Sequence, residues 1–125
     1  TVASPAYLYF FSRVPPAPDA DQYGSYHTAE IPYVFDNFGV STSPHANRDY
    51  NDTDRALSNI LASYWVNFAA TGDPNGEGLP DWPVFDREAD TLLEFGDTVE
   101  MRQGVRKDRL DFFDQFYAAQ QEQTN

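Results

Sequence analysis

The sequence contains no cysteine among its 125 residues. This absence excludes a disulfide framework, a thiol nucleophile and a thiolate metal site, and it leaves the redox compartment open. Basic residues are also scarce, because 8 Lys and Arg stand against 20 Asp and Glu, giving a formal net charge of −12. A chain with this charge repels nucleic-acid phosphates and anionic membrane surfaces, so we expect neither as a partner.

Long hydrophobic runs are missing as well, since no run approaches the roughly 20 apolar residues of a membrane span. Residues 1–5 lack the basic and apolar regions of a secretory signal, and the chain does not begin with methionine. We interpret it as a chain that starts within something larger. What it does contain is 41% hydrophobic and 16% aromatic residues, which suffices for one modest core.

The hydrophobic pattern predicts one buried strand, one hairpin and two helices. Residues 7–11 are five consecutive aromatic or apolar residues, typical of a strand covered on both faces. Residues 91–95 and 99–101 should form a hairpin. One helix should have Asp52 or Thr53 as its N-cap and stop before Gly72. Its apolar face would comprise Leu57, Ile60, Leu61, Tyr64, Trp65 and Phe68.

The second helix should run from about residue 105 to residue 119, with residues 120–125 frayed. Its apolar side would comprise Leu110, Phe113, Phe116 and Tyr117. Residues 15–21 are rich in proline and should form a surface loop, and residues 39–51 should form a polar loop. Residues 29–35 fit either a short helix interrupted at Pro32 or an irregular turn. We expect the irregular form, with Tyr33, Val34, Phe35 and Phe38 buried.

This set of elements is unusual for an independent fold. A central strand at residues 7–11 needs partners on both edges, and one hairpin cannot provide both together with two covering layers. The sequence therefore predicts the end of an α/β domain.

His27 is one of only two histidines, and it lies in a loop that follows the predicted buried strand. In open α/β sheets the chemistry takes place beyond the carboxyl ends of the strands. Imidazole suits general acid-base catalysis because its ordinary pKa, about 6.5, lies close to neutral pH. From the residues alone, His27 could be a catalytic acid-base or a hydrogen-bonded structural histidine beside the tyrosines.

Residues 24–35 read Gly-Ser-Tyr-His-Thr-Ala-Glu-Ile-Pro-Tyr-Val-Phe, and this segment resembles the one around the catalytic histidine of the type-B carboxylesterases. That family is the esterase and cholinesterase branch of the α/β-hydrolases. Residues 7–11 look like the late core strand of the family, and residues 64–75 look like its long C-terminal helix and the following turn. Residues 79–85 continue the pattern, so the resemblance spans roughly residues 7–116 in the right order.

The resemblance implies a serine hydrolase that acts on carboxylic esters, in which His27 links a nucleophilic serine to an acidic partner, usually glutamate. The chain, residues 1–125, would then be the C-terminal part of an α/β-hydrolase domain. It contains no Gly-x-Ser-x-Gly elbow and no glycine-rich oxyanion loop, so the nucleophile and its donors would lie upstream. We therefore expect the chain to be inactive alone, with an ester substrate and the missing N-terminal part of the same protein as its partners.

Three neighbours of His27 need separate interpretation. Ser25 is two residues away, and the family pattern places no nucleophile there. Glu30 matches an acidic position of the motif; it could order the histidine loop through backbone hydrogen bonds, or it could be a capping or surface carboxylate. Thr28 stands where the cholinesterase branch usually has glycine, which favours a general esterase over a cholinesterase.

Residues 73–78 imitate the first half of a calcium loop, but Val84 occupies the twelfth position, where a bidentate glutamate is required. We interpret this segment as a turn, and His45 as a solvated loop histidine. We expect neither a metal nor another cofactor. Two alternatives to an ester hydrolase stay open, namely a non-catalytic adhesion or binding domain of the same family and a small protein with its own fold. An exposed strand edge would also favour self-association.

Overall fold

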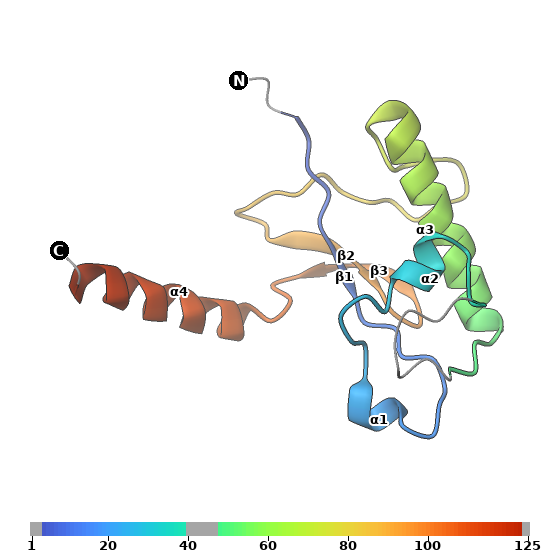
Figure 1. The fold of residues 1–125 in the computed structure, drawn as a ribbon. Helices are drawn as coiled ribbons and strands as arrows, with labels where there is room; N and C mark the ends of the chain where they lie inside the picture. Colours follow the sequence, from blue (N-terminus) through green and yellow to red (C-terminus); the bar gives the residue numbers. More distant parts are fainter. Residues whose placement is uncertain (1–3, 40–47, 124–125) are drawn as a thin grey trace.

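A computed structural model describes residues 4–39 and 48–123 of the chain. In chain order, the elements are β1 (Tyr9–Phe11), α1 (Ala20–Tyr23), α2 (Ile31–Val34), α3 (Asp52–Thr71), β2 (Thr91–Phe95), β3 (Val99–Gln103) and α4 (Lys107–Gln123). Figure 1 shows α3 and α2 on one side of a small sheet, while α4 extends away on the other side. None of the helices in the described residues is both long and apolar enough to cross a lipid bilayer.

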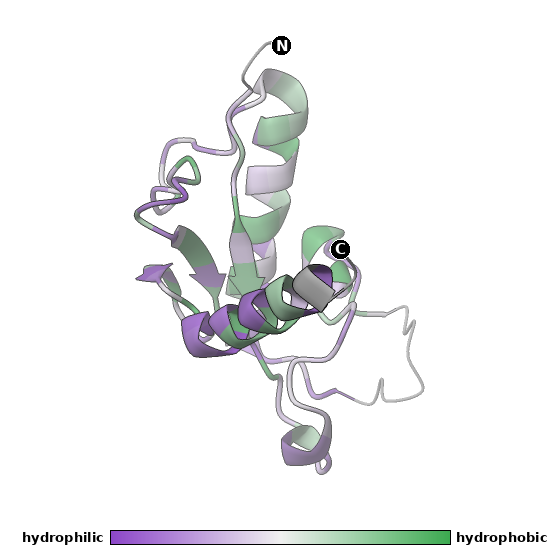
Figure 2. Ribbon diagram, turned by 90° about the vertical axis from the view of Figure 1, so that its left-hand side faces the viewer, coloured by the Kyte–Doolittle hydropathy of each residue, from purple (hydrophilic) through white to green (hydrophobic). Residues whose placement is uncertain are grey.

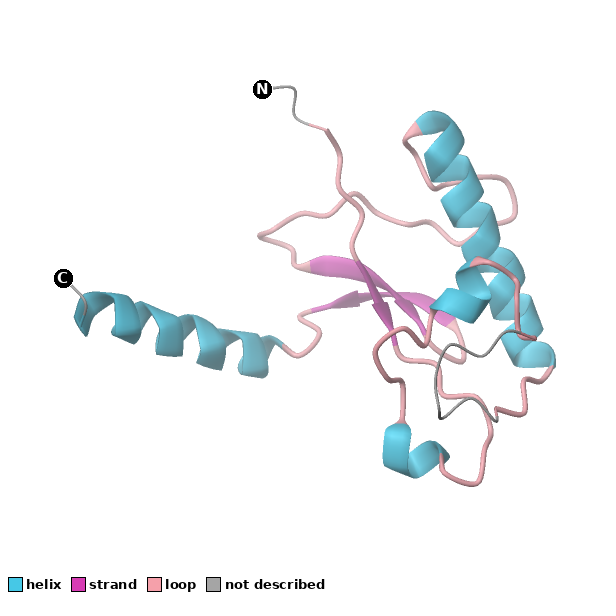
Figure 3. Cartoon of the chain, viewed as in Figure 1, coloured by secondary structure: helices cyan, strands magenta, loops and turns pink. Residues whose placement is uncertain are grey.

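The sheet has three strands in the order β1-β2-β3 (Figure 3). β1 runs parallel to β2, with Tyr9 opposite Leu93 and Phe11 opposite Phe95. β2 and β3 form the predicted antiparallel hairpin, with Phe95 opposite Val99. The parallel pair requires a long crossover, and residues 12–90 supply it, carrying the first three helices.

The core lies between the sheet and α3. Its buried members are Tyr33, Leu57, Leu61, Tyr64, Trp82, Leu93 and Phe95. Aromatic rings dominate it, and the Trp82 ring meets the rings of Tyr64 and Phe95 at centroid distances of 5.1 and 5.3 Å. The Trp82 indole also donates a hydrogen bond of 3.0 Å to the Leu8 carbonyl, so the loop before β2 is fixed to the chain entering β1.

The N-cap of α3 lies at least one residue before the predicted Asp52 or Thr53. Asn51 is the N-cap, and its side chain accepts hydrogen bonds from the backbone amides of Thr53 and Asp54. The Asp54 side chain in turn accepts from the Asn51 amide, which completes a capping box with aspartate at its third position. The helix ends at Gly72, whose φ of 81° lies in the left-handed region that glycine adopts without strain.

The predicted buried strand at residues 7–11 is shorter and more open than expected. Only Tyr9–Phe11 is β-strand, each of the three is half-buried, and Leu8 is exposed. Within the described residues β1 pairs with β2 alone, so its second edge has no partner strand. A central strand covered on both faces is therefore not complete in this part of the chain.

The segment expected to be irregular forms a one-turn helix, α2, because Pro32 falls in the first helical turn, where a missing N–H costs no hydrogen bond. Tyr33 is buried as predicted, whereas the expectation for Phe35 is wrong, since its side chain is 74% exposed. Phe35 is the C-cap of α2, just beyond the last helical residue.

α4 is the predicted final helix, but it starts two residues later and runs to Gln123, so residues 120–123 are helical rather than frayed. Apolar residues recur along both long helices (Figure 2). On α3 the face is largely buried, whereas the α4 side chains Leu110, Phe113, Phe116 and Tyr117 are all exposed. The spacing predicted the helix correctly, and the chain described here provides no surface that covers its apolar side.

Candidate active site

His27 lies in an exposed turn between α1 and α2. The Ala29 amide donates a hydrogen bond of 3.0 Å to the Tyr26 carbonyl and closes the turn around the histidine. The next residues follow directly into α2, because the Ile31 amide donates to the Thr28 carbonyl at 3.2 Å. The imidazole is thus presented to solvent by a short hydrogen-bonded backbone rather than by a long free loop.

Thr28 adopts a φ of 76°, in the left-handed region. It is the third residue of the turn that the Ala29 amide closes, and this position requires a positive φ in type II turns. A β-branched residue is strained there, whereas glycine would not be. The backbone at position 28 therefore has the conformation of a glycine, although the residue is threonine.

Ser25 fixes the His27 turn to the end of β1. Its hydroxyl donates a hydrogen bond of 3.0 Å to the Phe11 carbonyl. The end of β2 meets the same point, since the amides of Ser12 and Arg13 donate to the Phe95 carbonyl at 2.9 and 3.1 Å. His27 consequently follows the carboxyl ends of the two parallel strands, which is the edge where α/β proteins bind ligands. The Ser25 hydroxyl serves as an anchor in this arrangement.

Glu30 is half-buried at the N-cap position of α2, but its side chain makes no cap hydrogen bond. Its carbonyl accepts from the amides of Tyr33 and Val34. Burial raises the pKa of Tyr9, and the Glu30 charge adds to this rise. Of the predicted roles of Glu30, the structure therefore does not support side-chain capping.

His45, the second histidine, lies outside the described residues. In the segment that imitates a calcium loop, the Asp73 carboxylate accepts hydrogen bonds from the amide and the side chain of Asn75, at 3.0 and 2.9 Å. This is the turn that the sequence predicts. Over residues 4–39 and 48–123, no group of three His, Asp or Glu residues is arranged to hold a metal ion.

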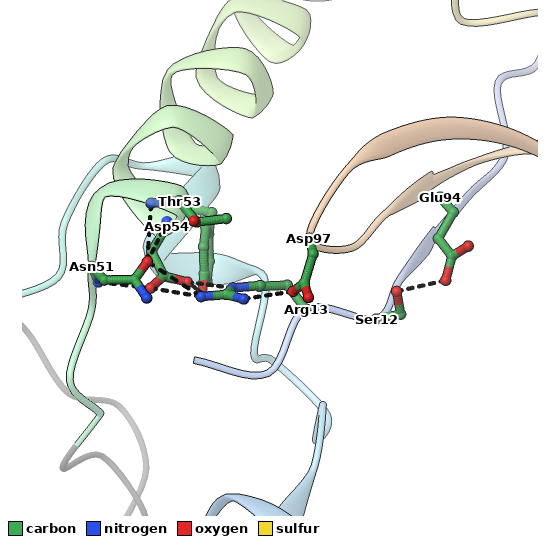
Figure 4. A network of polar contacts seen from close by, with 8 residues as sticks. Ser12, Arg13, Asn51, Thr53, Asp54, Glu94 and Asp97 are labelled. Carbon is green, nitrogen blue, oxygen red and sulfur yellow. Dashed lines mark hydrogen bonds and ion pairs between the residues drawn. The ribbon is translucent and has the colours of Figure 1, made fainter. Parts of the chain in front are cut away.

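A buried polar network, which the sequence did not predict, joins the segments around the site (Figure 4). Its centre is Arg13, whose Nε donates to Asp54 Oδ1 at 2.7 Å and whose second terminal nitrogen donates to Asp54 Oδ2 at 3.1 Å. The other terminal nitrogen donates to Asp97 Oδ1 in the hairpin turn at 2.5 Å. Tyr33 donates its hydroxyl proton to Asp54 Oδ1 at 2.7 Å. The network thus ties the end of β1 to α2, α3 and the β2–β3 turn.

The electrostatics of this network agree with its geometry. Burial by itself would raise the pKa of Asp54, but the hydrogen bonds from Arg13, the Asn51 amide and Tyr33 outweigh it and hold the pKa below its usual value. The same contacts raise the pKa of Arg13, chiefly through its hydrogen bond to Asp54. Burial raises the pKa of Tyr33, so its hydroxyl stays protonated as a donor. Asp54 is therefore a buried carboxylate with each oxygen hydrogen-bonded.

One signal for this network was present in the sequence. Asn51 and Asp54 are three residues apart at a helix start, as in a capping box. The pairing with Arg13, however, joins residues 41 positions apart. No local pattern indicates a contact at that separation.

Comparison with known proteins shows to which family the chain belongs. The family model described as "Carboxylesterase family" matches residues 1–113. The chain belongs to the carboxylesterase family. The match covers residues 24–35 and the segments that hold them, so the resemblance read from the sequence is confirmed.

Individual relatives agree with this assignment. The chain is 32% identical to a rat (Rattus norvegicus) acylcarnitine hydrolase, over 88% of this chain and 19% of the relative. It is 30% identical to rat carboxylesterase 1C, over 97% of this chain and 21% of the relative. The chain thus spans about a fifth of the length of the curated relatives that it matches.

Among solved structures, a carboxylesterase from Geobacillus stearothermophilus superimposes with a TM-score of 0.60 and 31% identity, over 82% of this chain and 21% of that one. The predicted fold class is therefore confirmed. This carboxylesterase-family chain is a partial α/β unit of an α/β-hydrolase, with a small sheet and its helices.

Proposed function

We propose that the protein containing this chain hydrolyses carboxylic esters, and that His27 is the histidine of a Ser-His-Glu/Asp triad. The observation that carries the proposal is the position of His27. The exposed turn that holds it is anchored by Ser25 at the carboxyl end of β1, in a chain of the carboxylesterase family. The serine, the acid and the oxyanion donors would come from outside residues 1–125, in the upstream part of the same protein.

In the proposed mechanism His27 moves one proton at each step. It takes the proton of the serine hydroxyl as the serine oxygen attacks the ester carbonyl. It then gives this proton to the departing alkoxide, so that an alcohol leaves and an acyl-enzyme forms. In deacylation it takes a proton from water, whose oxygen attacks the acyl carbon, and it returns the proton to serine as the carboxylic acid departs.

The exposure of His27 supports this role. Within the described residues, no hydrogen bond or ion pair joins the His27 side chain to another residue. A structural histidine would use its ring nitrogens to hold the loop, but here the backbone and Ser25 hold it. As far as the described residues are concerned, the two ring nitrogens stay available for a nucleophile on one side and a carboxylate on the other.

The test is the turnover of a short-chain aryl ester by the full-length protein. We expect His27→Gln to lower kcat by about 10⁴-fold or more, because a triad acts as a unit. His45→Gln, which replaces the other histidine of this chain, is the matched control and should leave kcat unchanged. Turnover near the wild-type rate in His27→Gln, with the fold intact by circular dichroism, would overturn the proposal.

The upstream coding sequence offers a second test. An ester hydrolase requires a serine in a Gly-x-Ser-x-Gly elbow and a later acidic residue. If the elbow serine is replaced by a residue without a nucleophile, the non-catalytic adhesion alternative is correct instead. A chain without that serine should then show no ester hydrolysis above buffer.

A further inference from the structure

Arg48 is a buried cation whose guanidinium forms no hydrogen bond within the described residues. The residue is 7% exposed, and its side chain is fully buried. Within the described part of the chain, none of its three guanidinium nitrogens has a hydrogen-bond partner. Burying such a group is unfavourable unless other interactions compensate. The position of Arg48 therefore needs an explanation other than ordinary hydrogen bonding.

Among the described residues, Asp19 and Tyr26 contact this guanidinium from the two sides of α1, and the Arg48 charge also opposes the rise that burial causes in the pKa of Tyr50. Asp19 Oδ1, at the N-cap of α1, lies 3.8 Å from a terminal nitrogen of Arg48. The Tyr26 ring, between α1 and His27, lies 5.5 Å from the Arg48 Cζ atom, within the range of a cation–π interaction. Both attractions are electrostatic, and both are stronger away from water.

The backbone adds a third connection in the same place. The amide of Asp49 donates a hydrogen bond of 2.8 Å to the Pro16 carbonyl. The segment before α3 is thereby fixed against the loop that leads into α1. Arg48 thus contacts Asp19, directly before α1, and Tyr26, which follows α1 and directly precedes His27.

We propose that Arg48 is a positioning residue for His27, acting through the Tyr26 ring and the Asp19 carboxylate to hold the turn in one orientation. This inference rests on the function proposed for His27. Ser25 fixes only one side of the turn, through the end of β1. Arg48 supplies the opposite side, from the segment that precedes α3. Held from both sides, the backbone that carries the exposed imidazole has a defined position, although the ring nitrogens make no bond within the described residues.

Positioning of this kind acts on the chemical step rather than on substrate binding. A general base must lie within hydrogen-bond distance of the proton that it removes, and a displacement of about 1 Å can cost about a hundredfold in rate. We expect Arg48→Met in the full-length enzyme to lower kcat at least tenfold, with KM for an aryl ester within about twofold of wild type. Arg48→Lys keeps the cation over the ring and should recover most of the loss.

The matched control is Arg55→Met. Arg55 lies over the Phe38 ring with its Cζ atom 6.0 Å from the centroid, so it makes the same type of contact outside the His27 turn. This control should leave kcat unchanged. Asp19→Asn removes the second contact at a partly exposed position and tests the proposal if Arg48→Met does not fold. It should lower kcat about threefold.

Amide hydrogen exchange, measured by mass spectrometry on the same full-length variants, does not depend on activity. The amides of Gly24 and Ala29 are hydrogen-bonded within the segment that Arg48 holds. In Arg48→Met they should exchange about tenfold faster, while amides in the middle of α3 keep the wild-type rate.

Three results would overturn the inference. The first is a kcat of Arg48→Met within twofold of wild type, and the second is a lower kcat without faster amide exchange in residues 16–30. The third is a kcat of Arg48→Lys no higher than that of Arg48→Met. If His27→Gln retains activity while exchange in Arg48→Met is faster, the proposed function fails but the contact of Arg48 with the turn is upheld.

Discussion

Arg13 and Arg48 are equally buried, at 7% exposure each, but their surroundings differ sharply. Arg13 donates to two carboxylates and to the Asn51 side chain, while Arg48 makes no hydrogen bond within the described residues. A buried ion pair is stabilising only when its geometry is excellent and its remaining hydrogen-bonding groups are satisfied. Arg13 meets this condition, so we assign it to the fold. Arg48 does not, and its contacts lead to the His27 turn instead.

The largest expected effect is that of Arg13→Met. It leaves the Asp54 carboxylate fully buried beside Tyr33 without a countercharge. Removal of one partner from a buried pair typically costs about 3–5 kcal/mol. Denaturant unfolding of the protein carrying this change should show a loss of that size. A loss of unfolding free energy below about 1 kcal/mol would mean that Arg13 stabilises the fold no more than Arg48 is expected to.

Acid should reduce the effect of this substitution. The folded state holds the pKa of Asp54 below its unfolded value, so the stabilisation is complete above about pH 4 and is lost as pH falls through the folded pKa. The difference in unfolding free energy between wild type and Arg13→Met should therefore narrow below about pH 4. A constant difference from pH 7 to pH 3 would show that Asp54 is not the group responsible.

Arg48→Met should have the smallest effect on stability. Replacing a buried cation that lacks hydrogen bonds by an apolar side chain of similar length is often neutral. We expect the unfolding free energy to change by less than about 1 kcal/mol, although kcat falls. A loss comparable to that of Arg13→Met would mean that Arg48, too, belongs to the fold.

The two long helices show how much of the fold the sequence could predict. Spacing of apolar residues predicted both, because the 3.6-residue period is a local property. It could not show that Leu61 is buried while Phe113 is exposed, since burial depends on which surface packs against the helix. The hairpin was predicted for the same local reasons, whereas the parallel pairing of β1 with β2 joins residues more than 80 positions apart.

For the candidate site, the sequence indicated His27 but not the residues that hold its turn in place. The sequence motif around His27 indicated the family, and the comparisons with known proteins confirm it. Ser25 was noted only because it lies near His27, and its bond to the Phe11 carbonyl emerges from the folded chain. Arg13 and Arg48 carry no local motif for their contacts, and the capping-box spacing of Asp54 indicates only its contact with Asn51. Their roles depend on segments brought together by the crossover from β1 to β2.

The most direct test of the account is the rate of acyl-enzyme formation by His27→Gln. The full-length protein is mixed rapidly with an activated aryl ester, and the first turnover of released phenol is followed in wild type, His27→Gln and His45→Gln. We predict that His27→Gln slows this step by about 10⁴-fold or more, while His45→Gln matches wild type. An acylation rate for His27→Gln within tenfold of wild type would contradict the assignment of His27 as the catalytic base.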